Sequence, residues 1–273
     1  NPAGIAVQCI GDVPAADITV VIDEADNCST PTVAFVSDSD NGGLGTTVSP
    51  YVVTRTYSVT DAAGNSINVV QLITAIDDQN PTASNPAGIA VQCIGDVPAA
   101  DITVVIDEAD NCSTPTVAFV SDSDNGGLGT TVSPYVVTRT YSVTDAAGNS
   151  INVVQLITAI DDTAPIISSC PTNLVECAAN EVTQKAVVSN IELNPLNYSD
   201  NCGGVLTVQY QIKDKDNTIL VDFGDDADGD ASGYDFPEGL NTITYRVIDV
   251  AGLSSDCSFT ITVKHKPGLS NIE

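Results

Sequence analysis

Clusters of aspartate are the residues of this sequence whose type and spacing could do chemistry. In the segment 222–235, Asp226, Asp228 and Asp230 stand at alternate positions, a spacing that can direct carboxylates at one hard cation. The segment is not an EF-hand loop, because Ala231 stands where that loop requires glycine. The sequence therefore leaves two interpretations open, a calcium site in this insert or a solvent-exposed acidic loop.

Two further acidic pairs each precede an x-x-Pro sequence. They are Asp77-Asp78 and Asp161-Asp162, and they resemble the acidic linkers that calcium rigidifies in cadherins. We treat these four residues as candidate calcium ligands. The alternative is that each aspartate caps a turn, since its side chain can accept hydrogen bonds from nearby main-chain NH groups.

No comparable set of catalytic groups accompanies the carboxylates. The only histidine of the sequence is His265, which lies between Lys264 and Lys266. A Ser-His-Asp site would require this single residue to fold back onto a distant part of the chain. We therefore expect no enzymatic activity from this chain.

An internal repeat organises the chain that must position these residues. Residues 1–78 and 85–162 are identical, so Cys9 recurs as Cys93 at a period of 84 residues, and the alignment continues to Cys177. A period of this length suits one small domain. Linkers of only a few residues predict that the domains form an elongated rod. We expect three domains, which we call the first, second and third repeat, at residues 1–78, 79–162 and 163–273.

The eight cysteines favour disulfides over metal binding, because no C-x-x-C pair is present. Disulfides in turn indicate an oxidising compartment. Cys9 and Cys28 are the only cysteines of the first repeat, so we expect them to pair with each other or to stay free. Extended by the repeat, this reasoning predicts the pairs Cys9–Cys28, Cys93–Cys112, Cys177–Cys202 and Cys170–Cys257.

The composition excludes two classes of partner. The formal net charge is -28 with only eight lysines and arginines, which makes binding to nucleic acid or to anionic lipid headgroups unfavourable. No run of 18 apolar residues occurs, so we expect no membrane insertion of this segment.

The secondary structure is predicted to be all β. Segments rich in Val, Ile, Thr and Tyr alternate with clusters of Gly, Pro, Asn and Asp, and in the first repeat the predicted strands are 18–22, 32–36, 51–60 and 67–76. Alternation in 53–59 directs Val53 and Tyr57 to a core, whereas Arg55 interrupts the pattern, so we expect it near an edge of the sandwich. Asp61 to Asn65 suits a hairpin turn. About seven short strands per repeat predict an immunoglobulin-like β-sandwich.

The third repeat resembles the HYR (hyalin repeat) domain. The resemblance covers about 110 residues and departs at Leu253, where the family more often has asparagine. It is carried by Cys170-Pro171, Asp200-Asn201-Cys202, Phe236-Pro237-Glu238-Gly239, Thr244-Tyr245, Asp249-Val250-Ala251-Gly252 and Cys257-Ser258-Phe259-Thr260. The first two repeats are similar to the degenerate HYR-like repeats of large SprB-type gliding adhesins of Bacteroidota, with Asp26-Asn27-Cys28-Ser29 and the run from Tyr57 to Asn65.

This resemblance implies an immunoglobulin-like fold and an extracellular, cell-surface role without catalytic residues. It also implies gliding motility or attachment, with export through the type IX system. The expected partners are a surface polysaccharide or substratum and the machinery of export and surface anchoring. We expect a structural or adhesive stalk segment, because whole domains are duplicated and no catalytic constellation is present. The alternatives are a calcium-dependent glycan-binding module and an accessory domain of a secreted enzyme.

Overall fold

The computed structural model describes residues 1–188, 197–225 and 229–267. The described chain divides into two compact units. The first unit comprises Asn1–Ile89, Ala99–Ser123 and Thr138–Leu156, and the second comprises Ala90–Pro98, Asp124–Val137 and Ile157–Glu273. Each unit contains one junction between consecutive repeats. Within the described residues, no helix is long and apolar enough to cross a membrane.

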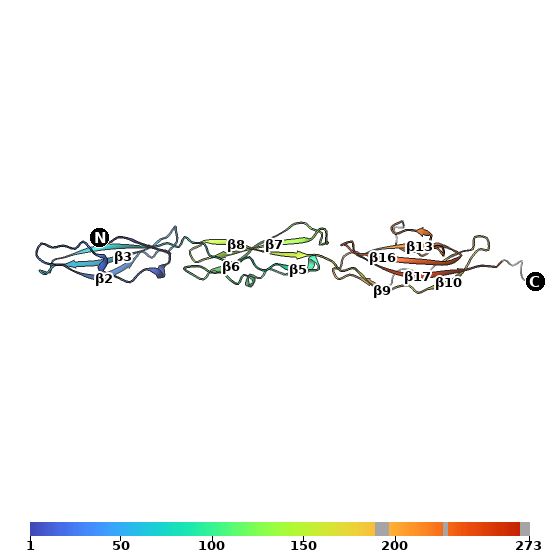
Figure 1. Cartoon of the computed structure of the whole chain (residues 1–273), viewed down its shortest axis with the longest axis horizontal. Helices are drawn as coiled ribbons and strands as arrows, with labels where there is room; N and C mark the ends of the chain where they lie inside the picture. Colours follow the sequence, from blue (N-terminus) through green and yellow to red (C-terminus); the bar gives the residue numbers. More distant parts are fainter. Residues whose placement is uncertain (189–196, 226–228, 268–273) are drawn as a thin grey trace, which may run out of the picture. The chain divides into compact units, whose positions relative to one another are not determined.

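The first repeat is built on one four-stranded sheet in the order β1-β4-β3-β2, of which β2 and β3 are labelled in Figure 1. β1 runs parallel to β4, and the other neighbours are antiparallel. Its strands are β1 (Ile5–Val7), β2 (Thr32–Asp40), β3 (Tyr51–Thr60) and β4 (Ser66–Ala75), and its 3-10 helices are η1 (Ile10–Asp12) and η2 (Ile18–Val20). Val53 and Tyr57 are buried as predicted, and the Asp61–Asn65 turn closes the β3–β4 hairpin with Gly64 at φ 91°.

The second repeat has the same elements in the same order, β5-β8-β7-β6. They are β5 (Ile89–Val91), η3 (Ile94–Asp96), η4 (Ile102–Val104), β6 (Thr116–Asp124), β7 (Tyr135–Thr144) and β8 (Ser150–Ala159). Tyr141, Val143 and Val153 form a buried cluster with Val105, and Ala83 packs against this cluster. The polypeptide just before Asn85 therefore contributes to the core of this repeat.

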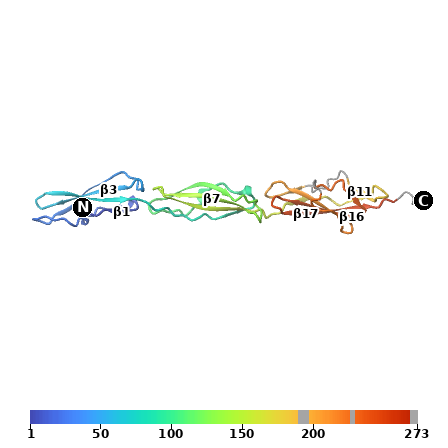
Figure 2. The same ribbon diagram turned by 90° about the horizontal axis from the view of Figure 1, so that it is seen from above.

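The third repeat has a five-stranded sheet in the order β10-β17-β16-β13-β14 and two small sheets, β11-β15 and β12-β9. β16 and β17 are antiparallel neighbours, as two perpendicular views show (Figures 1 and 2). The strands are β9 (Ile166–Ser169), β10 (Leu174–Cys177), β11 (Lys185–Val187), β12 (Asn197–Ser199), β13 (Thr207–Lys213), β14 (Ile219–Val221), β15 (Asp235–Pro237), β16 (Gly239–Ile248) and β17 (Ser254–Lys264).

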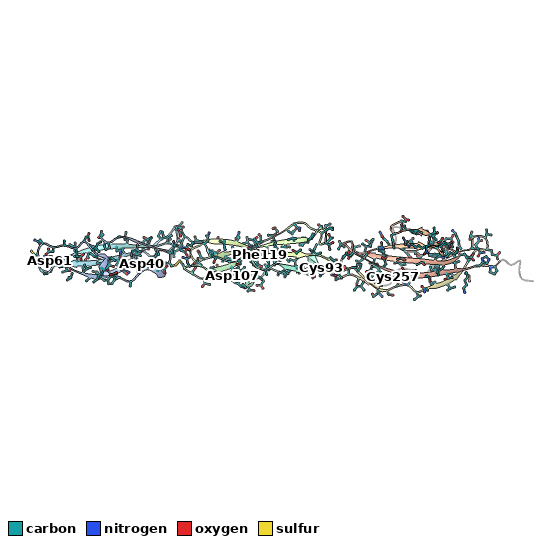
Figure 3. All side chains as sticks on the ribbon, viewed as in Figure 1. Asp40, Asp61, Cys93, Asp107, Phe119 and Cys257 are labelled. Atoms are coloured by element: carbon teal, nitrogen blue, oxygen red, sulfur yellow. A yellow bond between two sulfur atoms is a disulfide. The ribbon has the colours of Figure 1, made fainter. Side chains whose placement is uncertain are left out.

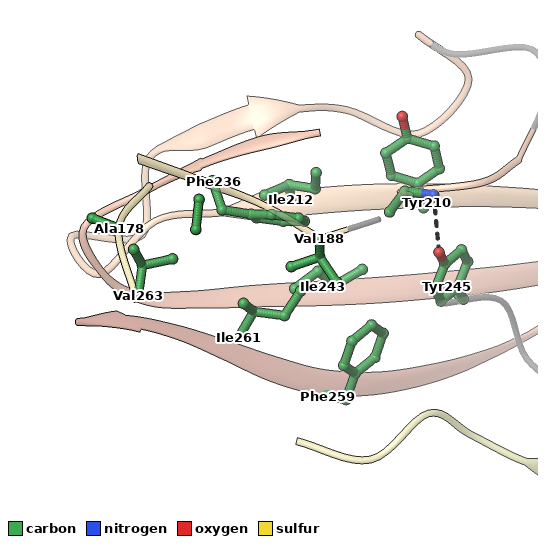
Figure 4. Close-up of a cluster of buried hydrophobic side chains, with 12 residues drawn as sticks. Ala178, Val188, Tyr210, Ile212, Phe236, Ile243, Tyr245, Phe259, Ile261 and Val263 are labelled. Atoms are coloured by element: carbon green, nitrogen blue, oxygen red, sulfur yellow. Dashed lines mark hydrogen bonds between the residues drawn. The ribbon is translucent and has the colours of Figure 1, made fainter. Parts of the chain in front are cut away.

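The core of the third repeat lies between the large sheet and the small β11-β15 sheet. Phe236 of β15 packs with Ile243 and Ile261 of the large sheet, and all three are fully buried (Figure 4). The hydroxyl of Tyr245 accepts a hydrogen bond from the main-chain NH of Ala231 at 3.0 Å, which satisfies a polar group inside the core. The prediction of an all-β chain of tandem sandwich domains is confirmed.

Three local predictions are wrong. The first and second repeats each contain four strands and two 3-10 helices instead of about seven strands. The segment 18–22 contains the 3-10 helix Ile18–Val20 instead of a strand, because the Asp17 side chain accepts hydrogen bonds from both the main-chain NH and the hydroxyl of Thr19. Arg55 is buried on β3, which has β2 on one side and β4 on the other, so it does not lie near an edge of the sandwich.

Burial of Arg55 is possible because its charge is fully compensated. The guanidinium donates to Asp38 through Nε at 2.9 Å and Nη2 at 2.8 Å, and Nη2 also donates to the carbonyl of Pro14. Arg55 is only 3% exposed. The Asp38 carboxylate raises the pKa of this guanidinium further, against the effect of burial. Arg139 and Asp122 repeat the pair in the second repeat.

Replacing both aspartates of these pairs, Asp38→Asn with Asp122→Asn, should lower the free energy of unfolding by about 3 kcal/mol per repeat, because each change leaves a buried guanidinium without its counter-ion. Urea unfolding followed by circular dichroism measures the loss. The exposed Asp12 and Asp96, both changed to Asn, provide the matched control and should unfold like the unchanged chain. Equal midpoints for the two double variants would contradict the buried-pair interpretation.

Candidate functional site

Three disulfides are present, and two of them join consecutive repeats. Cys9 bonds to Cys112 with Cα atoms 5.1 Å apart, and Cys93 bonds to Cys202 with Cα atoms 5.0 Å apart. The predicted pairs Cys9–Cys28, Cys93–Cys112 and Cys177–Cys202 are therefore wrong. The predicted pair Cys170–Cys257, which ties the start of the third repeat to its last strand, is confirmed. Cys28 and Cys177 are free and exposed.

The length of the strands explains why Cys9 does not pair with Cys28. Cys9 follows β1, whose last residue Val7 pairs with Ala75 at one end of the sheet. Cys28 lies at the other end, where Ser29 accepts a hydrogen bond from Ala62 in the β3–β4 turn. Asp40 and Asp61 mark these two ends in Figure 3. A ten-residue strand such as β3 spans about 33 Å, whereas a disulfide requires Cα atoms within about 7 Å.

An aspartate fixes the conformation of the loop that carries Cys112. Asp110 Oδ2 accepts hydrogen bonds from the NH groups of Cys112 at 2.9 Å and of Ser113 at 3.0 Å. In the first repeat, Asp26 makes the same bonds to Cys28 and Ser29 at the same distances. The loop therefore has this conformation whether or not its cysteine is bonded.

Carboxylates converge beside the Cys93–Cys202 disulfide. Asp161, Asp200 and Asp249 each offer one oxygen within 4.8 Å of the others. Asp161 and Asp249 are only 7% and 6% exposed. Oδ2 of Asp249 and both oxygens of Asp200 are buried and receive no hydrogen bond from the residues that the structure describes. Buried carboxylate oxygens without donors are costly, and a bound cation would compensate them.

The electrostatics of this cluster also favour a cation. Burial raises the pKa of Asp161 above its ordinary value, and the neighbouring charges of Asp200 and Asp249 raise it further, while a hydrogen bond from the Thr163 NH opposes the shift. A divalent cation between the three carboxylates would reverse the repulsion that they exert on one another.

The Cys9–Cys112 junction repeats this arrangement. Asp77 and Asp110 approach each other within 4.8 Å, and burial together with Asp110 and Asp145 raises the pKa of Asp77. Asp110 Oδ1 is buried without a donor among the described residues. Cys112 lies in the same group, but its sulfur is bonded to Cys9 and cannot act as a thiolate ligand. Asn149 Nδ2 donates to the Asp77 carbonyl at 3.3 Å and to Asp145 Oδ2 at 2.8 Å, which links the two repeats.

Oxygen ligands define the kind of ion that these clusters would accept. Carboxylates select hard cations such as calcium or magnesium, and three carboxylates around a partly open position leave room for the further oxygens that calcium takes.

The structure brings together only part of the predicted calcium ligands. Asp77 and Asp161 lie in the clusters, whereas Asp78 and Asp162 are exposed and outside them. Asp230 accepts hydrogen bonds from the NH and hydroxyl of its neighbour Ser232. The two other aspartates of the predicted insert site, Asp226 and Asp228, lie outside the described residues.

Sequence reasoning missed the remaining members of both clusters. They are Asp110 at the first junction, with Asp145 nearby, and Asp200 and Asp249 at the second. Two features of the sequence could have indicated these residues. The sequence Asp-Asn-Cys and the aspartate that begins the β-hairpin turn each recur once per repeat. They could not be interpreted alone, because the partner of each motif belongs to the preceding repeat.

Comparisons with known proteins agree with this architecture. Residues 160–263 match the family model of the HYR domain, so the predicted resemblance of the third repeat is confirmed. No curated protein sequence matches the chain.

Similar solved structures include cadherins. The structure of the protocadherin gammaB7 EC3-6 cis-dimer has 12% identity and a TM-score of 0.30, over 86% of this chain and 66% of that one. Protocadherin Gamma B7 extracellular cadherin domains 1-4 have 14% identity and a TM-score of 0.28, over 77% and 57%. Drosophila N-cadherin EC1-4 has 12% identity and a TM-score of 0.24, over 96% and 74%. The chain thus spans about two thirds or less of the length of the first two structures.

Tryptic digestion without reduction will test the pairing, because the first two repeats contain no lysine and one arginine each. Cleavage after Arg55 and Arg139 yields peptides 1–55 and 56–139, and the Cys9–Cys112 bond should hold them together. The Cys93–Cys202 bond should add peptide 186–213 to the same species. Mass spectrometry should therefore detect one three-peptide assembly that reduction separates.

The pair Cys170–Cys257 serves as the internal control, since it should link peptides 140–185 and 247–264 in the same digest. Release of peptide 1–55 with an internal disulfide would show that Cys9 pairs with Cys28 and would overturn the cross-junction pairing.

Proposed function

We propose that this chain is a structural stalk segment of an exported, cell-surface adhesin, in which consecutive repeats are fastened to one another at every junction. The observation that carries the proposal is the pair of equivalent disulfides, Cys9–Cys112 and Cys93–Cys202, each of which crosses one junction. A binding module that acts alone needs no covalent bond to the next repeat. A stalk that carries load or spans a distance benefits from such a bond, because the bond keeps consecutive repeats in a fixed arrangement.

Each junction disulfide restricts the hinge that a peptide linker alone would permit. Two repeats joined by one chain can pivot about the linker, but a second covalent connection beside it removes most of this freedom. We propose that the repeats form an elongated, stiff segment for this reason. The disulfides also require an oxidising environment, which supports an extracellular location.

We propose that bound calcium is the second connection between the repeats at each junction. The clusters Asp161–Asp200–Asp249 and Asp77–Asp110, with Asp145 nearby, contain carboxylates from both of the repeats that meet there. A cation bound to both repeats would favour the joined arrangement by mass action. It would act as a structural ion without a catalytic role.

The adhesive context rests on the HYR domain in the third repeat. Together with the similarity of the first two repeats to SprB-type adhesins, it supports a role in gliding or attachment and export by the type IX system. The partners would then be a substratum or surface polysaccharide and the anchoring machinery. His265, which lies 3.3 Å from Glu238 and is exposed, offers no support for catalysis.

Small-angle scattering will test the stalk. The oxidised chain should have a maximum dimension of roughly 100–130 Å, the length of three sandwiches end to end. Removing both junction bonds (Cys9→Ser, Cys112→Ser, Cys93→Ser and Cys202→Ser together) should broaden the distance distribution, because the linkers regain their hinge. The control, Cys28→Ser with Cys177→Ser, removes only free thiols and should scatter like the unchanged chain. A compact oxidised particle, or no difference between the two variants, would contradict the stalk.

Calorimetric titration will test the junction cation. The chain should bind calcium at its two junctions with Kd values of about 10⁻⁴–10⁻³ M, as extracellular modules do. Asp200→Asn should abolish one of these sites, since neither oxygen of Asp200 has another partner among the described residues. The matched control is Asp162→Asn, at an exposed residue outside the two clusters, and this change should leave both sites intact.

The pH dependence of calcium binding follows from the raised pKa values of Asp77 and Asp161. Protons compete with the cation, so the affinity should fall as the pH is lowered through these pKa values. In the calcium-free chain, the same groups favour the folded state at low pH, and this contribution is lost as the pH rises through their folded pKa values. Calcium should therefore stabilise the chain most at neutral pH, and equal melting in calcium and in chelator at pH 7 would refute the cation site.

A further inference from the structure

The two junction disulfides close overlapping loops of the chain. The Cys9–Cys112 bond closes a loop of residues 9–112, and the Cys93–Cys202 bond closes a loop of residues 93–202. The two loops share residues 93–112 of the second repeat, whereas bonds within each repeat would have closed separate loops. Building on the proposed stalk function, we propose that this overlap makes the stalk a tension-bearing tether, in which load crosses the second repeat through residues 93–112 and bypasses its β-sheet.

The path of the load follows from the connectivity of the bonds. When a cross-linked chain is pulled taut, its shortest covalent path carries the tension, because every longer branch is still slack. That path enters the second repeat through the Cys9–Cys112 bond and leaves it through the Cys93–Cys202 bond. Between the two bonds it follows the backbone backward from Cys112 to Cys93, a separation of nineteen residues. The remainder of the repeat lies on longer branches.

The segment that carries the load lies outside the sheet. Residues 93–112, all of which the structure describes, include the 3-10 helices η3 and η4 but none of the strands. β5 ends at Val91, before the segment, and β6 begins at Thr116, after it. Tension along the path therefore does not pull apart the hydrogen-bonded neighbours β8, β7 and β6. The sheet can keep its folded surface while the stalk is under load.

The loaded segment is attached to the rest of its repeat by a few side-chain and main-chain contacts. Val105 is buried in one cluster with Tyr141, and the main-chain NH of Asp101 donates to the hydroxyl of Tyr141 at 3.3 Å. Ala109 forms an isolated bridge with Thr82, through hydrogen bonds of 2.7 and 2.9 Å. These contacts can yield and let the segment straighten, so the segment is the compliant part of the repeat.

The overlap limits how far the repeat can extend. Fully straight, the backbone from Cys93 to Cys112 reaches about 68 Å, whereas the 84 residues of one period would reach about 300 Å. The junction bonds thus limit the extension of this repeat to less than a quarter of its contour length. A stalk with bonds inside each repeat would lack this limit, because the backbone between repeats would carry the load.

The same overlap keeps the chain in one piece after a single backbone cut. A cut within residues 113–201 leaves both parts joined through Cys93–Cys202, and a cut within residues 10–92 leaves them joined through Cys9–Cys112. Exposed loop tips are the preferred sites of such cuts, and Val132, in the loop between β6 and β7, is 93% exposed. An extracellular tether therefore gains resistance to proteolysis as well as to tension.

Force spectroscopy on the whole chain, held by peptide tags at its two ends, tests the load path. In the starting variant the junction bonds are the only disulfides, because the other four cysteines are replaced (Cys28→Ser, Cys170→Ser, Cys177→Ser and Cys257→Ser). The oxidised variant should become taut at about 350 Å, and the same variant reduced with dithiothreitol at about 980 Å. Both lengths are reached after unfolding, so they do not depend on how stable the variant is.

Two matched insertions locate the path. A ten-residue Gly-Ser segment inserted after Ile106 lies on the path and should lengthen the taut oxidised chain by about 36 Å, whereas the same segment after Val132 lies on a slack branch and should add nothing. Both sites are exposed, at 86% and 93%. After reduction, the two insertions should lengthen the chain equally.

The proposal is overturned by an oxidised chain that the Val132 insertion lengthens, by one that the Ile106 insertion does not lengthen, or by equal taut lengths before and after reduction. Failure of the stalk function itself would appear instead as a compact particle in small-angle scattering of the unchanged oxidised chain. The two failures are therefore distinguishable.

Discussion

The short reach of a disulfide is the constraint on which this structure depends. Its two Cα atoms must lie within about 7 Å, whereas Cys9 and Cys28 of the first repeat stand at opposite ends of strands that are several times longer. Cys9 therefore cannot bond to Cys28 and bonds across the junction to Cys112. This bond holds the ends of consecutive repeats together, and Asp77 and Asp110 lie beside it.

Holding the junctions together brings like charges into contact. The chain has 36 acidic residues and only eight lysines and arginines, and its three arginines each make an ion pair with an aspartate of the neighbouring strand. None of these arginines compensates the carboxylates at the junctions. The covalent bond and the hydrogen bonds from Asn149 and from the Asp110 loop thus oppose a repulsion that a divalent cation would remove.

Patterns confined to one repeat were predictable from the sequence. Strands β2, β3 and β4 coincide with runs of β-branched and aromatic residues, and the Asp61–Asn65 turn has the glycine that its positive φ requires. Predictions failed where a side chain found a partner that is distant in sequence. Arg55 interrupts the apolar alternation of its strand. It can be buried there because Asp38, seventeen residues away on β2, supplies its counter-ion. The 3-10 helix at Ile18–Val20 forms because the side chain of the preceding residue caps it, although the β propensity of these residues favours a strand.

The sequence by itself determined the repeat, its period, the all-β class, the HYR-like character of the third repeat and the Cys170–Cys257 bond. It also identified Asp77 and Asp161 as members of a possible cation site. Only the tertiary structure decided which cysteines pair across the junctions and which carboxylates converge. The physical reason is that a perfect repeat presents identical residues in every copy, so sequence cannot distinguish a partner within a repeat from the same partner one period later, whereas the length of the folded strands permits only the latter.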